Sequence, residues 1–562
     1  MKPVKEELTA LLLAALKMAL KEESPAVDIA SSFETPREEK FGDLSTHIVL
    51  RLAKEMKRPP RPMAEEVQKS LEKLVQGGSL KDRISKISVE GPGFINFYYS
   101  KREIANVLLK IKKEGKDFGR PKGVHKKNIL LEFVSANPTG PLTVAHGRQA
   151  ALGDSLAIIL KFCGHAVTKE YYNNDEGVQI ETLGKSTELR AREILGGQTL
   201  EMPENFYKGA YLVDTARKLV AKNGEALMKL APEERTRVCA DFAKKDILQG
   251  IQKDLNDFGV EFDQYFSQAE LMKSGKVERA LETLKKKGFV YEKDGAVWFA
   301  STRFGDDKDR VLIKSDKSYT YLLPDIAYHE DKFRRKFDFL IDILGPDHHG
   351  YIPRIKASME ALGFPKGALE ILIAQLVTLF EGEKTLRMST RAGEFVTLRE
   401  ILDEVGKDAG RFFFLMRKFD AHLDFDLALA KSQTPENPVF YIQYAHARIE
   451  SIKKTFEEKN GKLSWGSEDC LAKLSNPAEI GLMRVLSQYE DAVAGAEKTL
   501  EPYRLVPYLM DLAGAFHRFY TENRVVTEDA VLTQARMMLV ISVQAVLRSG
   551  LGLLGVSAPL KM

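Results

Sequence analysis

The sequence holds few of the features that mark secreted, membrane or zinc-binding proteins. Only three of its 562 residues are cysteine, and they lie far apart with no Cys-x-x-Cys pair. This argues against a disulfide framework and against a zinc module. No uninterrupted apolar stretch approaches the roughly 18 residues that a membrane span needs. We therefore expect a cytoplasmic protein that does not span a membrane.

Net charge is also nearly absent, with 84 Lys and Arg against 80 Asp and Glu. A global field this weak does not indicate a polyanionic partner, so any nucleic acid would have to meet local basic patches. Residues 51–61 carry five basic side chains against one acidic, and residues 101–127 carry ten against three. Such blocks are commonly only solvated faces, and contact with a phosphate backbone is the alternative.

The N-terminal apolar run from Leu8 to Leu20 resembles a signal peptide only superficially. Glu6 and Glu7 precede it and Lys17 interrupts it at helical spacing, which favours an amphipathic helix. A second helix through His47 to Met56 and a strand pair, at about 84–89 and 94–99, complete a small α+β domain. We place this N-terminal domain at residues 1–120.

From Asn128 onward, apolar runs alternate with amphipathic helices, the pattern of βαβ units and a parallel sheet. The first set of predicted elements is a strand at 129–134, a helix at about 145–161 and a strand at 166–172. The second set is a strand at 311–313, a strand at 337–344, a helix at 352–362 and a strand-like run at 369–380. A charged, helical stretch separates the two sets, which predicts a doubly wound, Rossmann-like sheet split by an insertion.

A chain of 562 residues and 63.2 kDa exceeds one hydrophobic core, so a multidomain α/β protein is expected. We divide the predicted sheet domain into residues 121–182 and 301–436, with the insertion at 183–300. Beyond residue 437 the β signal vanishes. Four helical segments, at about 438–454, 478–498, 502–523 and 528–547, predict a C-terminal α-helical bundle over residues 437–562.

Three loops could carry chemistry. The first, Leu131 to Arg148, follows a predicted strand and opens a helix, a position where sheets of this kind bind phosphates. It lacks the Gly-x-Gly-x-x-Gly turn of dinucleotide-dependent oxidoreductases. Glu132 lies inside the strand, where a carboxylate needs a cation or several donors unless it faces solvent on an edge strand; both alternatives stay open.

The second loop, Gly345 to Tyr351, contains Asp-His-His after a strand, and a grip on hydroxyls or phosphates fits it better than a metal site, so we predict no metal ligands. The third, Arg387 to Val396, is basic and contains glycine, and its arginines could stabilise a developing negative phosphate. A surface turn would be the better explanation if this loop stood alone.

Together these loops resemble those of class I aminoacyl-tRNA synthetases, and the likeness extends to the arginyl-tRNA synthetase family over nearly the whole chain. Thr143-Val-Ala-His146 stands at the His-x-Gly-His signature and Arg387-Met-Ser-Thr-Arg391 at the Lys-Met-Ser-Lys-Ser signature. Further sequence motifs that resemble the family lie at 169–179, 321–329 and 443–448, and toward both ends of the chain at 41–45, 91–97 and 549–559. The number, order and spacing of these motifs carry the resemblance.

The resemblance implies an enzyme that joins arginine to tRNA(Arg) through an arginyl-adenylate. Such an enzyme needs ATP, with Mg²⁺. The resemblance also implies that the protein is a monomer. The implied arginine ligands are Glu132, Asn137, Gln179, Tyr321 and Asp325. The implied ATP-binding residues are Ala145, His146, Asp347, His349 and Met388. The implied catalytic residues are Thr143, His146, Arg387, Ser389 and Arg391. The implied tRNA contacts are Phe41, Asn96, Tyr444, Arg448 and Met562.

The signatures depart from the family pattern where chemistry is expected. Thr143 replaces the first histidine, Ala145 replaces a glycine, and Arg387 and Thr390 replace two lysines. Each missing transition-state donor can cost on the order of 100- to 1000-fold in rate. Lys384, Arg148 or the loop arginines could supply the charge. The alternative is an impaired relative that binds arginine or tRNA without efficient aminoacylation.

Overall fold

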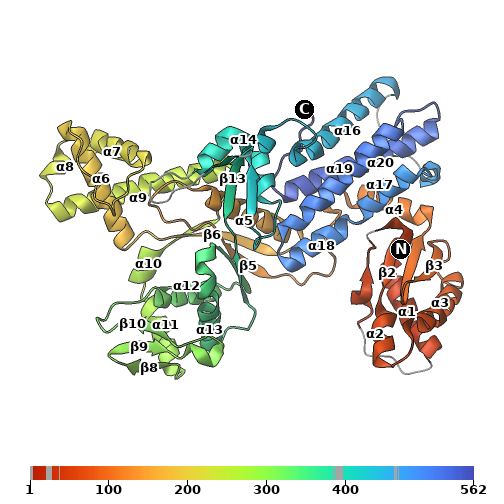
Figure 1. Ribbon diagram of the computed structural model, residues 1–562, viewed down its shortest axis with the longest axis horizontal. Helices are drawn as coiled ribbons and strands as arrows, with labels where there is room; N and C mark the ends of the chain where they lie inside the picture. The colour runs from red at the N-terminus through yellow and green to blue at the C-terminus, as the bar shows by residue number, and fades with distance from the viewer. Residues whose placement is uncertain are drawn as a thin grey trace.

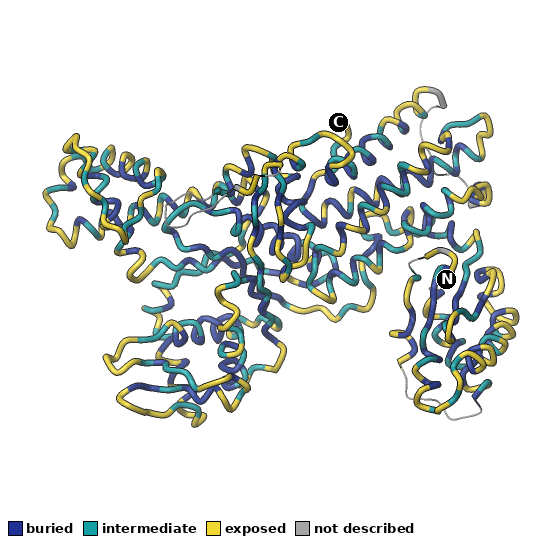
Figure 2. Tube along the Cα trace, viewed as in Figure 1, coloured by how far each residue is buried: buried dark blue, intermediate teal, exposed yellow. Residues whose placement is uncertain are grey.

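The computed structural model describes residues 4–20, 28–36, 38–382, 384–386, 396–460, 465 and 468–562. Four lobes surround a central sheet (Figure 1): a helical lobe on the left, a mixed lobe below it, the N-terminal domain at the lower right and the C-terminal helices at the upper right. Buried chain is concentrated in the central sheet and the C-terminal helices (Figure 2). The multidomain α/β architecture that the sequence predicts is confirmed.

The N-terminal domain is built on its own hydrophobic core. Its helices are α1 (Val4–Leu20), α2 (Ile48–Glu55) and α3 (Pro60–Gln76). Its antiparallel sheet has the order β1-β2-β4-β3, from β1 (Phe33–Glu34), β2 (Leu44–Thr46), β3 (Ile84–Glu90) and β4 (Phe94–Tyr99). Leu8, Leu12 and Leu16 are buried on one face of α1, which confirms the amphipathic helix.

The central sheet is parallel throughout, in the order β12-β11-β5-β6-β7. Its strands are β5 (Asn128–Glu132), β6 (Ala166–Asn173), β7 (Gln264–Ser267), β11 (Phe339–Leu344) and β12 (Leu369–Ile373). The connecting helices α5 (Val144–Phe162), α12 (Leu322–Arg334) and α13 (Ile352–Leu362) pack on it. The chain runs from β5 toward β6 but from β11 toward β12, so the order reverses between β5 and β11. Ligands bind at the carboxyl ends of strands flanking such a reversal.

The stretch between the two halves of the sheet is not one continuous insertion. A helical lobe comes first: α6 (Val178–Gly196), α7 (Ala210–Asn223), α8 (Ala226–Lys229) and α9 (Pro232–Asp257). The chain then returns to the central sheet as β7 before a second lobe forms. That lobe contains α10 (Gln268–Lys273), α11 (Lys276–Lys286), β8 (Val290–Lys293), β9 (Ala296–Phe299) and β10 (Arg310–Ile313).

Two strand predictions were wrong. The strand expected at 311–313 for the parallel sheet is β10, which pairs antiparallel with β9 in the sheet β10-β9-β8. The run expected at 369–380 is broken into β12 and β13 (Val377–Glu381), and β13 belongs to a separate sheet of order β14-β13-β15. The other strands of that sheet are β14 (Lys384–Leu386) and β15 (Leu423–Asp426), and the helices of this region are α14 (Leu398–Phe414) and α15 (Leu427–Lys431).

The C-terminal bundle consists of α16 (Pro438–Asn460), α17 (Pro477–Ser487), α18 (Tyr489–Thr499), α19 (Leu505–Glu522) and α20 (Ala530–Leu553). The helix expected at 478–498 is two helices that meet at Gln488. Helix α4 (Lys101–Glu114) leaves the N-terminal domain and packs on α17 and α20. Short 3₁₀ turns cover Ala30–Ser32, Glu39–Phe41, Gly115–Asp117, Ser301–Phe304, Glu468–Lys473 and Pro502–Arg504.

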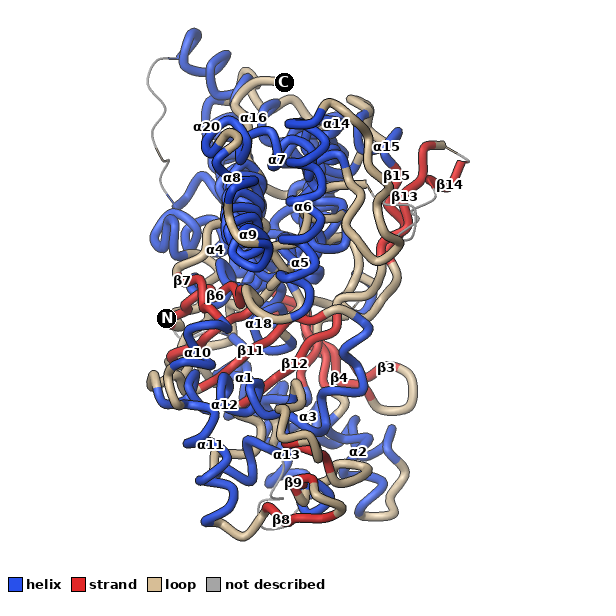
Figure 3. Tube along the Cα trace, turned by 90° about the vertical axis from the view of Figure 1, so that its left-hand side faces the viewer, coloured by secondary structure: helices blue, strands red, loops and turns tan. Residues whose placement is uncertain are grey.

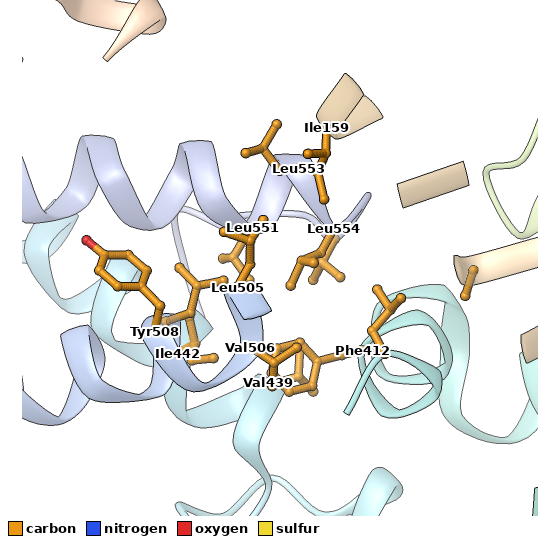
Figure 4. Close-up of a cluster of buried hydrophobic side chains, with 14 of the residues drawn as sticks. Ile159, Phe412, Val439, Ile442, Leu505, Val506, Tyr508, Leu551, Leu553 and Leu554 are labelled. Atoms are coloured by element: carbon orange, nitrogen blue, oxygen red, sulfur yellow. The ribbon is translucent and has the colours of Figure 1, made fainter. Parts of the chain in front are cut away.

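A continuous apolar core joins the C-terminal bundle to the central sheet and its helices. Figure 4 shows Ile159 of α5 and Phe412 of α14 beside Val439 of α16, Leu505 of α19 and Leu551 of α20. By length and composition alone, α20 could cross a membrane, with a mean hydropathy of 1.6 over its most apolar window. That window is 67% buried inside the protein, and the helix packs on α16 and α19. It is thus a core helix of the bundle.

Candidate active site

The first two predicted loops meet at the carboxyl ends of β5 and β11. The loop after β5 leads into α5, and β11 leads into a 3₁₀ helix, Pro346–Tyr351. A β-carbon on Gly345 would lie 2.7 Å from Asp347 Oδ1 and 3.8 Å from Gln149 Nε2 of α5. Asp347 also acts electrostatically on His146. The structure therefore brings together the two segments expected to face ATP; the exposed His349 lies on the same 3₁₀ helix.

His146 lies in the first turn of α5 with one ring nitrogen committed. Its Nδ1 accepts a hydrogen bond from the Thr143 main-chain N–H at 3.1 Å and lies 3.0 Å from the Thr143 hydroxyl. An acceptor Nδ1 places the proton of a neutral ring on Nε2. Burial lowers the pKa of His146 to about 4, so the ring is neutral near pH 7. Nε2–H is then the hydrogen-bond donor that His146 can offer.

The third loop lies mostly outside the described residues, and with it Arg387, Met388, Ser389 and Arg391. The segment that follows is fixed on the first loop. Val144 N–H donates to the Val396 carbonyl at 3.0 Å, and Leu398 N–H donates to the Leu142 carbonyl at 2.8 Å. The chain that follows the third loop, from Val396 onward, therefore lies beside the first signature segment where α5 begins.

The chain turns sharply as it leaves β5. Val134 and Ser135 have φ values of 68° and 42°, a region that side-chain-bearing residues rarely adopt, least of all a β-branched one. The turn lets the Ser135 hydroxyl donate to Glu132 Oε1 at 2.9 Å and accept from the Tyr172 N–H at 3.0 Å. Backbone strain of this kind is concentrated at functional sites.

Glu132 belongs to a row of carboxylates that crosses the sheet. Asp342 of β11, Glu132 of β5 and Glu170 of β6 are in register on adjacent strands, and all three are buried. The strand order places β5 between β11 and β6, two strands that Figure 3 labels in the central sheet, so the edge-strand alternative for Glu132 is wrong. Burial of three adjacent carboxylates requires cations or donors nearby.

Helix α12 supplies those partners. Lys332, which is fully buried, donates to Glu132 and, at 2.7 Å, to Asp342. The Tyr328 hydroxyl lies 2.9 Å from Glu132 and 2.7 Å from Glu170. His329 pairs with Asp342, and Arg335 pairs with Glu170 just beyond the helix. Burial alone would raise the pKa of Asp342, but Lys332 and His329 hold it well below its usual range; burial raises the pKa of Glu132.

The N-terminal end of α12 carries a further carboxylate, Asp325, without an ion pair. Among the described residues no Lys, Arg or His side chain bonds to it, whereas each carboxylate of the row has such a partner. The Tyr351 hydroxyl faces it, and burial raises the pKa of the Asp325 carboxyl. Tyr321, immediately before α12, is 86% exposed. An unpaired carboxylate beside an open tyrosine suits a cationic ligand.

Two other predicted arginine ligands meet although they lie far apart in sequence. Asn137 Nδ2 donates to Gln179 Oε1 at 2.6 Å, which joins the first loop to the start of α6. Close by, the Tyr211 hydroxyl of α7 donates to the Thr139 carbonyl at 2.6 Å. The helical lobe thus contacts the first loop through α6 and α7.

Arg148 cannot supply the missing signature charge. Its guanidinium is fully buried and donates to the main-chain carbonyls of Gln375, Leu376, Lys418 and Ala421. Burial lowers its pKa to about 10. The prediction that Arg148 could supply the missing charge was wrong, because the residue instead holds α5 to the segments that lead into β13 and β15. Lys384 is exposed on β14.

Aromatic side chains gather on α16 where tRNA contact was predicted. Tyr444 stacks on Phe440, and the Arg448 guanidinium lies 4.9 Å above the Tyr444 ring. Phe440 and Met562 line one hollow of about 390 Å³ between α16 and α14. His446 Nδ1 and the Pro559 carbonyl, 2.8 Å apart, hold the C-terminal tail against α16. The structure thus brings Tyr444, Arg448 and Met562 to one surface.

The predicted contacts of the N-terminal domain are less open. Asn96 is 2% exposed, and its Oδ1 accepts from the Ser45 hydroxyl at 2.6 Å. Phe41 is half-buried. In the basic stretch 51–61 the three arginines pair with glutamates, which favours the solvated-face interpretation there. Stretch 101–127 is paired only in part.

Comparison with known proteins decides the family. The descriptions that match are "Arginyl tRNA synthetase N terminal domain" at residues 6–99, "tRNA synthetases class I (R), catalytic domain" at 103–416 and "DALR anticodon binding domain" at 442–562. The chain belongs to the arginyl-tRNA synthetase family. As a class I aminoacyl-tRNA synthetase it is an enzyme, a ligase that uses ATP as a substrate.

Individual relatives of arginyl-tRNA synthetase type agree over the full length. An arginine–tRNA ligase from Desulfosudis oleivorans is 45% identical over 567 residues and covers 100% of both chains. One from Syntrophotalea carbinolica is 46% identical, covering 94% of this chain and 95% of its own. The solved arginyl-tRNA synthetase of Thermus thermophilus has the same fold, with a TM-score of 0.76 at 23% identity and full coverage of both chains. Nothing in these comparisons supports the impaired alternative.

The partners of the carboxylate row were not predicted from the sequence. Tyr328, His329, Lys332 and Arg335 follow Asp325 at intervals of three and four residues, and in the structure they share one face of the α12 segment. The available signal was this run of polar side chains at helical spacing after Asp325. Only the fold shows that this run faces β5, β6 and β11.

Proposed function

We propose that this enzyme joins arginine to tRNA(Arg) in two steps at the crevice between β5 and β11. An oxygen of the arginine carboxylate attacks the α-phosphorus of ATP, and the bond to the bridging oxygen of pyrophosphate breaks. A hydroxyl of the terminal ribose of tRNA then attacks the arginyl carbonyl and AMP leaves. No covalent bond to the protein is needed, so the enzyme acts by positioning and charge stabilisation.

The observation that carries the arginine assignment is Asp325, a carboxylate with no ion pair among the described residues. A guanidinium is a planar fork of donors that stays charged at any physiological pH, and a carboxylate accepts it in a bidentate manner. Glu132 would take a further donor, Tyr321 would cover the ligand, and Asn137 with Gln179 would bind its polar end. Lysine's compact ammonium lacks this planar fork, so it cannot meet a carboxylate in the same bidentate manner.

ATP would lie over the first turn of α5. His146 Nε2–H and the Thr143 hydroxyl are donors for its phosphates, and Ala145 would border the adenine. Asp347 and His349 would face the ribose and phosphates from the other loop. Among the described residues no three His, Cys, Asp or Glu side chains gather as metal ligands, so we assign Mg²⁺ to the ATP phosphates rather than to a resident protein site.

The third loop would close over the phosphates. Arg387 and Arg391 stand where the family signature has charged residues, Ser389 can donate a hydrogen bond, and Met388 would pack on the nucleotide. All four lie outside the described residues, but the following segment is fixed beside Thr143. We infer that these arginines replace the lysines that the signature lacks.

The C-terminal bundle would read the anticodon arm through Tyr444, Arg448 and Met562. The N-terminal domain would touch the outer corner of the tRNA through Phe41, whereas the buried Asn96 would act only by holding the Ser45 hydroxyl. An aromatic platform with a neighbouring arginine binds unstacked bases by stacking and charge. We further propose that the enzyme is a cytoplasmic monomer.

A charging assay tests the proposal. The purified protein is incubated with ATP, tRNA and one radiolabelled amino acid: arginine, lysine or citrulline, which is the neutral isostere of arginine. We expect arginyl-tRNA to form and neither of the other two products to accumulate. If no arginyl-tRNA forms while tRNA still binds, the impaired alternative replaces the ligase. Charging with citrulline at a similar rate would show that the carboxylates do not select the ligand.

A further inference from the structure

The side chains of α12 divide into two groups by position along the helix. Tyr321 and Asp325, at its N-terminal end, are the residues we assign to arginine. Tyr328, His329 and Lys332, one and two turns later, bind no proposed ligand and instead contact the row of carboxylates under the crevice. One helix therefore presents substrate ligands at one end and anchors to the sheet at the other.

Glu132 connects the two groups, because it bonds to the anchoring residues and keeps an acceptor site for a ligand. Oε2 accepts from Lys332 and lies 2.9 Å from the Tyr328 hydroxyl, whose single proton is shared with Glu170, and Oε1 accepts from the Ser135 hydroxyl. A carboxylate offers about four lone-pair sites, so one acceptor site remains, on Oε1. These contacts fix the orientation of the carboxylate. They therefore fix the direction from which a further donor can reach Oε1.

Lys332 decides whether that acceptor carries a negative charge. Glu132 has Asp342 on one side and Glu170 on the other in the same row. Both neighbours, like burial itself, favour the neutral acid over the carboxylate. Lys332 is the cation that bonds directly to Glu132 among the described residues. Tyr328 and Ser135 donate to it but carry no charge.

We propose that Lys332 is a positioning residue for arginine recognition: it holds Glu132 ionised and turned so that Oε1 receives the substrate guanidinium. This inference rests on the function proposed above. Lys332 does not touch the substrate, because its nitrogen lies between Glu132 and Asp342 and is fully buried. Its effect reaches the substrate through one carboxylate.

The test compares the steady-state kinetics of the Lys332→Met variant with those of the wild type, with tRNA and ATP saturating and arginine varied, then with ATP varied. We expect KM for arginine to rise on the order of 10- to 100-fold. Side chains that hydrogen-bond to a metal ligand and orient it have effects of this size. KM for ATP should stay within about threefold. Lys276→Met is the matched control, because Lys276 pairs with Asp331 of the same helix but lies away from Glu132; its KM for arginine should not change.

A pH profile separates positioning from simple damage to the fold. Without Lys332, Glu132 faces Asp342, Glu170, Tyr172, Tyr328 and His329, and no lysine or arginine bonds to it. Its proton is then held more tightly, so kcat/KM for arginine in Lys332→Met should rise with pH along a limb that the wild type shows only at lower pH. Asp342→Asn should move that limb the opposite way, because it removes a negative neighbour and leaves Lys332 to Glu132.

Tyr328→Phe keeps the test decisive if Lys332→Met does not fold. It removes one donor from Glu132 and preserves the ring, and we expect KM for arginine to rise several-fold with ATP unaffected. The inference is overturned if folded Lys332→Met, or Tyr328→Phe in its place, leaves KM for arginine unchanged, or if arginine and ATP are affected alike. Those results would leave charging by the wild type intact, whereas failure of the proposed function would abolish it in the wild type.

Discussion

Replacing Asp325 by asparagine is the sharpest single test of the arginine pocket. The substitution keeps the size of the side chain and one acceptor oxygen, but it removes the charge and turns an NH₂ group toward the guanidinium. A hydrogen bond to a charged group contributes about 1.5–3 kcal/mol. Losing one such bond, together with the charge that strengthens the other, should cost about 3–4 kcal/mol of transition-state binding.

At about 1.4 kcal/mol per tenfold, that cost is a loss of roughly 100- to 1000-fold in kcat/KM for arginine. The assay is tRNA charging with arginine varied at saturating ATP, repeated with ATP varied at the highest usable arginine. KM for ATP should stay within about threefold, because Asp325 lies at the start of α12 and faces the Tyr351 hydroxyl, not the first turn of α5 to which ATP is assigned.

The pH dependence follows from the same carboxyl group. Burial raises the pKa of Asp325, and the guanidinium needs the ionised form, so wild-type kcat/KM for arginine should fall as pH falls toward that raised pKa. The Asp325→Asn variant should lose this limb, because its amide does not titrate. Glu330→Gln on the same helix is the control, since Glu330 pairs with Arg334 instead. Equal losses for arginine and ATP, or an arginine loss below tenfold, would refute the assignment.

Three further predictions concern the rest of the molecule. Arg411→Met removes a fully buried guanidinium that joins α14 to an aspartate of α5 and to the end of α20. The loss of about 3 kcal/mol in the free energy of unfolding should lower the first thermal transition by about 6–12 °C. A shift below about 2 °C would contradict this prediction. Thr143→His with Ala145→Gly should raise kcat in tRNA-dependent pyrophosphate exchange about tenfold or more; an unchanged kcat would mean that the third loop already supplies this stabilisation. Tyr444→Ala should raise KM for tRNA about 10- to 100-fold and leave KM for arginine unchanged, which kinetics with tRNA varied would check.

Elements with strong periodicity were predictable because their burial is set by their own residues. Helix α1 buries Leu8, Leu12 and Leu16, and β5 is an apolar run that is buried on both faces. Strand β7 was missed because Gln264–Ser267 is short and only half-buried. Its place in the sheet comes from pairing with β6, some ninety residues earlier, and no local pattern encodes such a partner. The same limit explains why β10 was assigned to the wrong sheet.

The candidate site shows a similar division. The sequence located Glu132 as an anomaly, since a carboxylate in an apolar strand stands out locally, but its cation lies 200 residues away on α12. Arg148 shows the converse error. It lies two residues after His146 in sequence, yet its guanidinium points into main-chain carbonyls on the far side of α5. Proximity in sequence identified the loops that form the site, and only the fold shows which charges face it.

Those charges explain why an enzyme for a cation keeps a lysine beside its ligand. Asp325, Glu132, Glu170 and Asp342 are four carboxylates, and the described cations that face them are Lys332, Arg335 and, when protonated, His329. When all four are ionised, at least one negative charge is uncompensated before substrate binds, and a guanidinium neutralises it. Without Lys332 the surplus would be larger, but the buried carboxyls would take up protons instead and present neutral acids to the ligand. Partial neutralisation thus keeps an ionised acceptor available, and a neutral analogue such as citrulline cannot complete the balance.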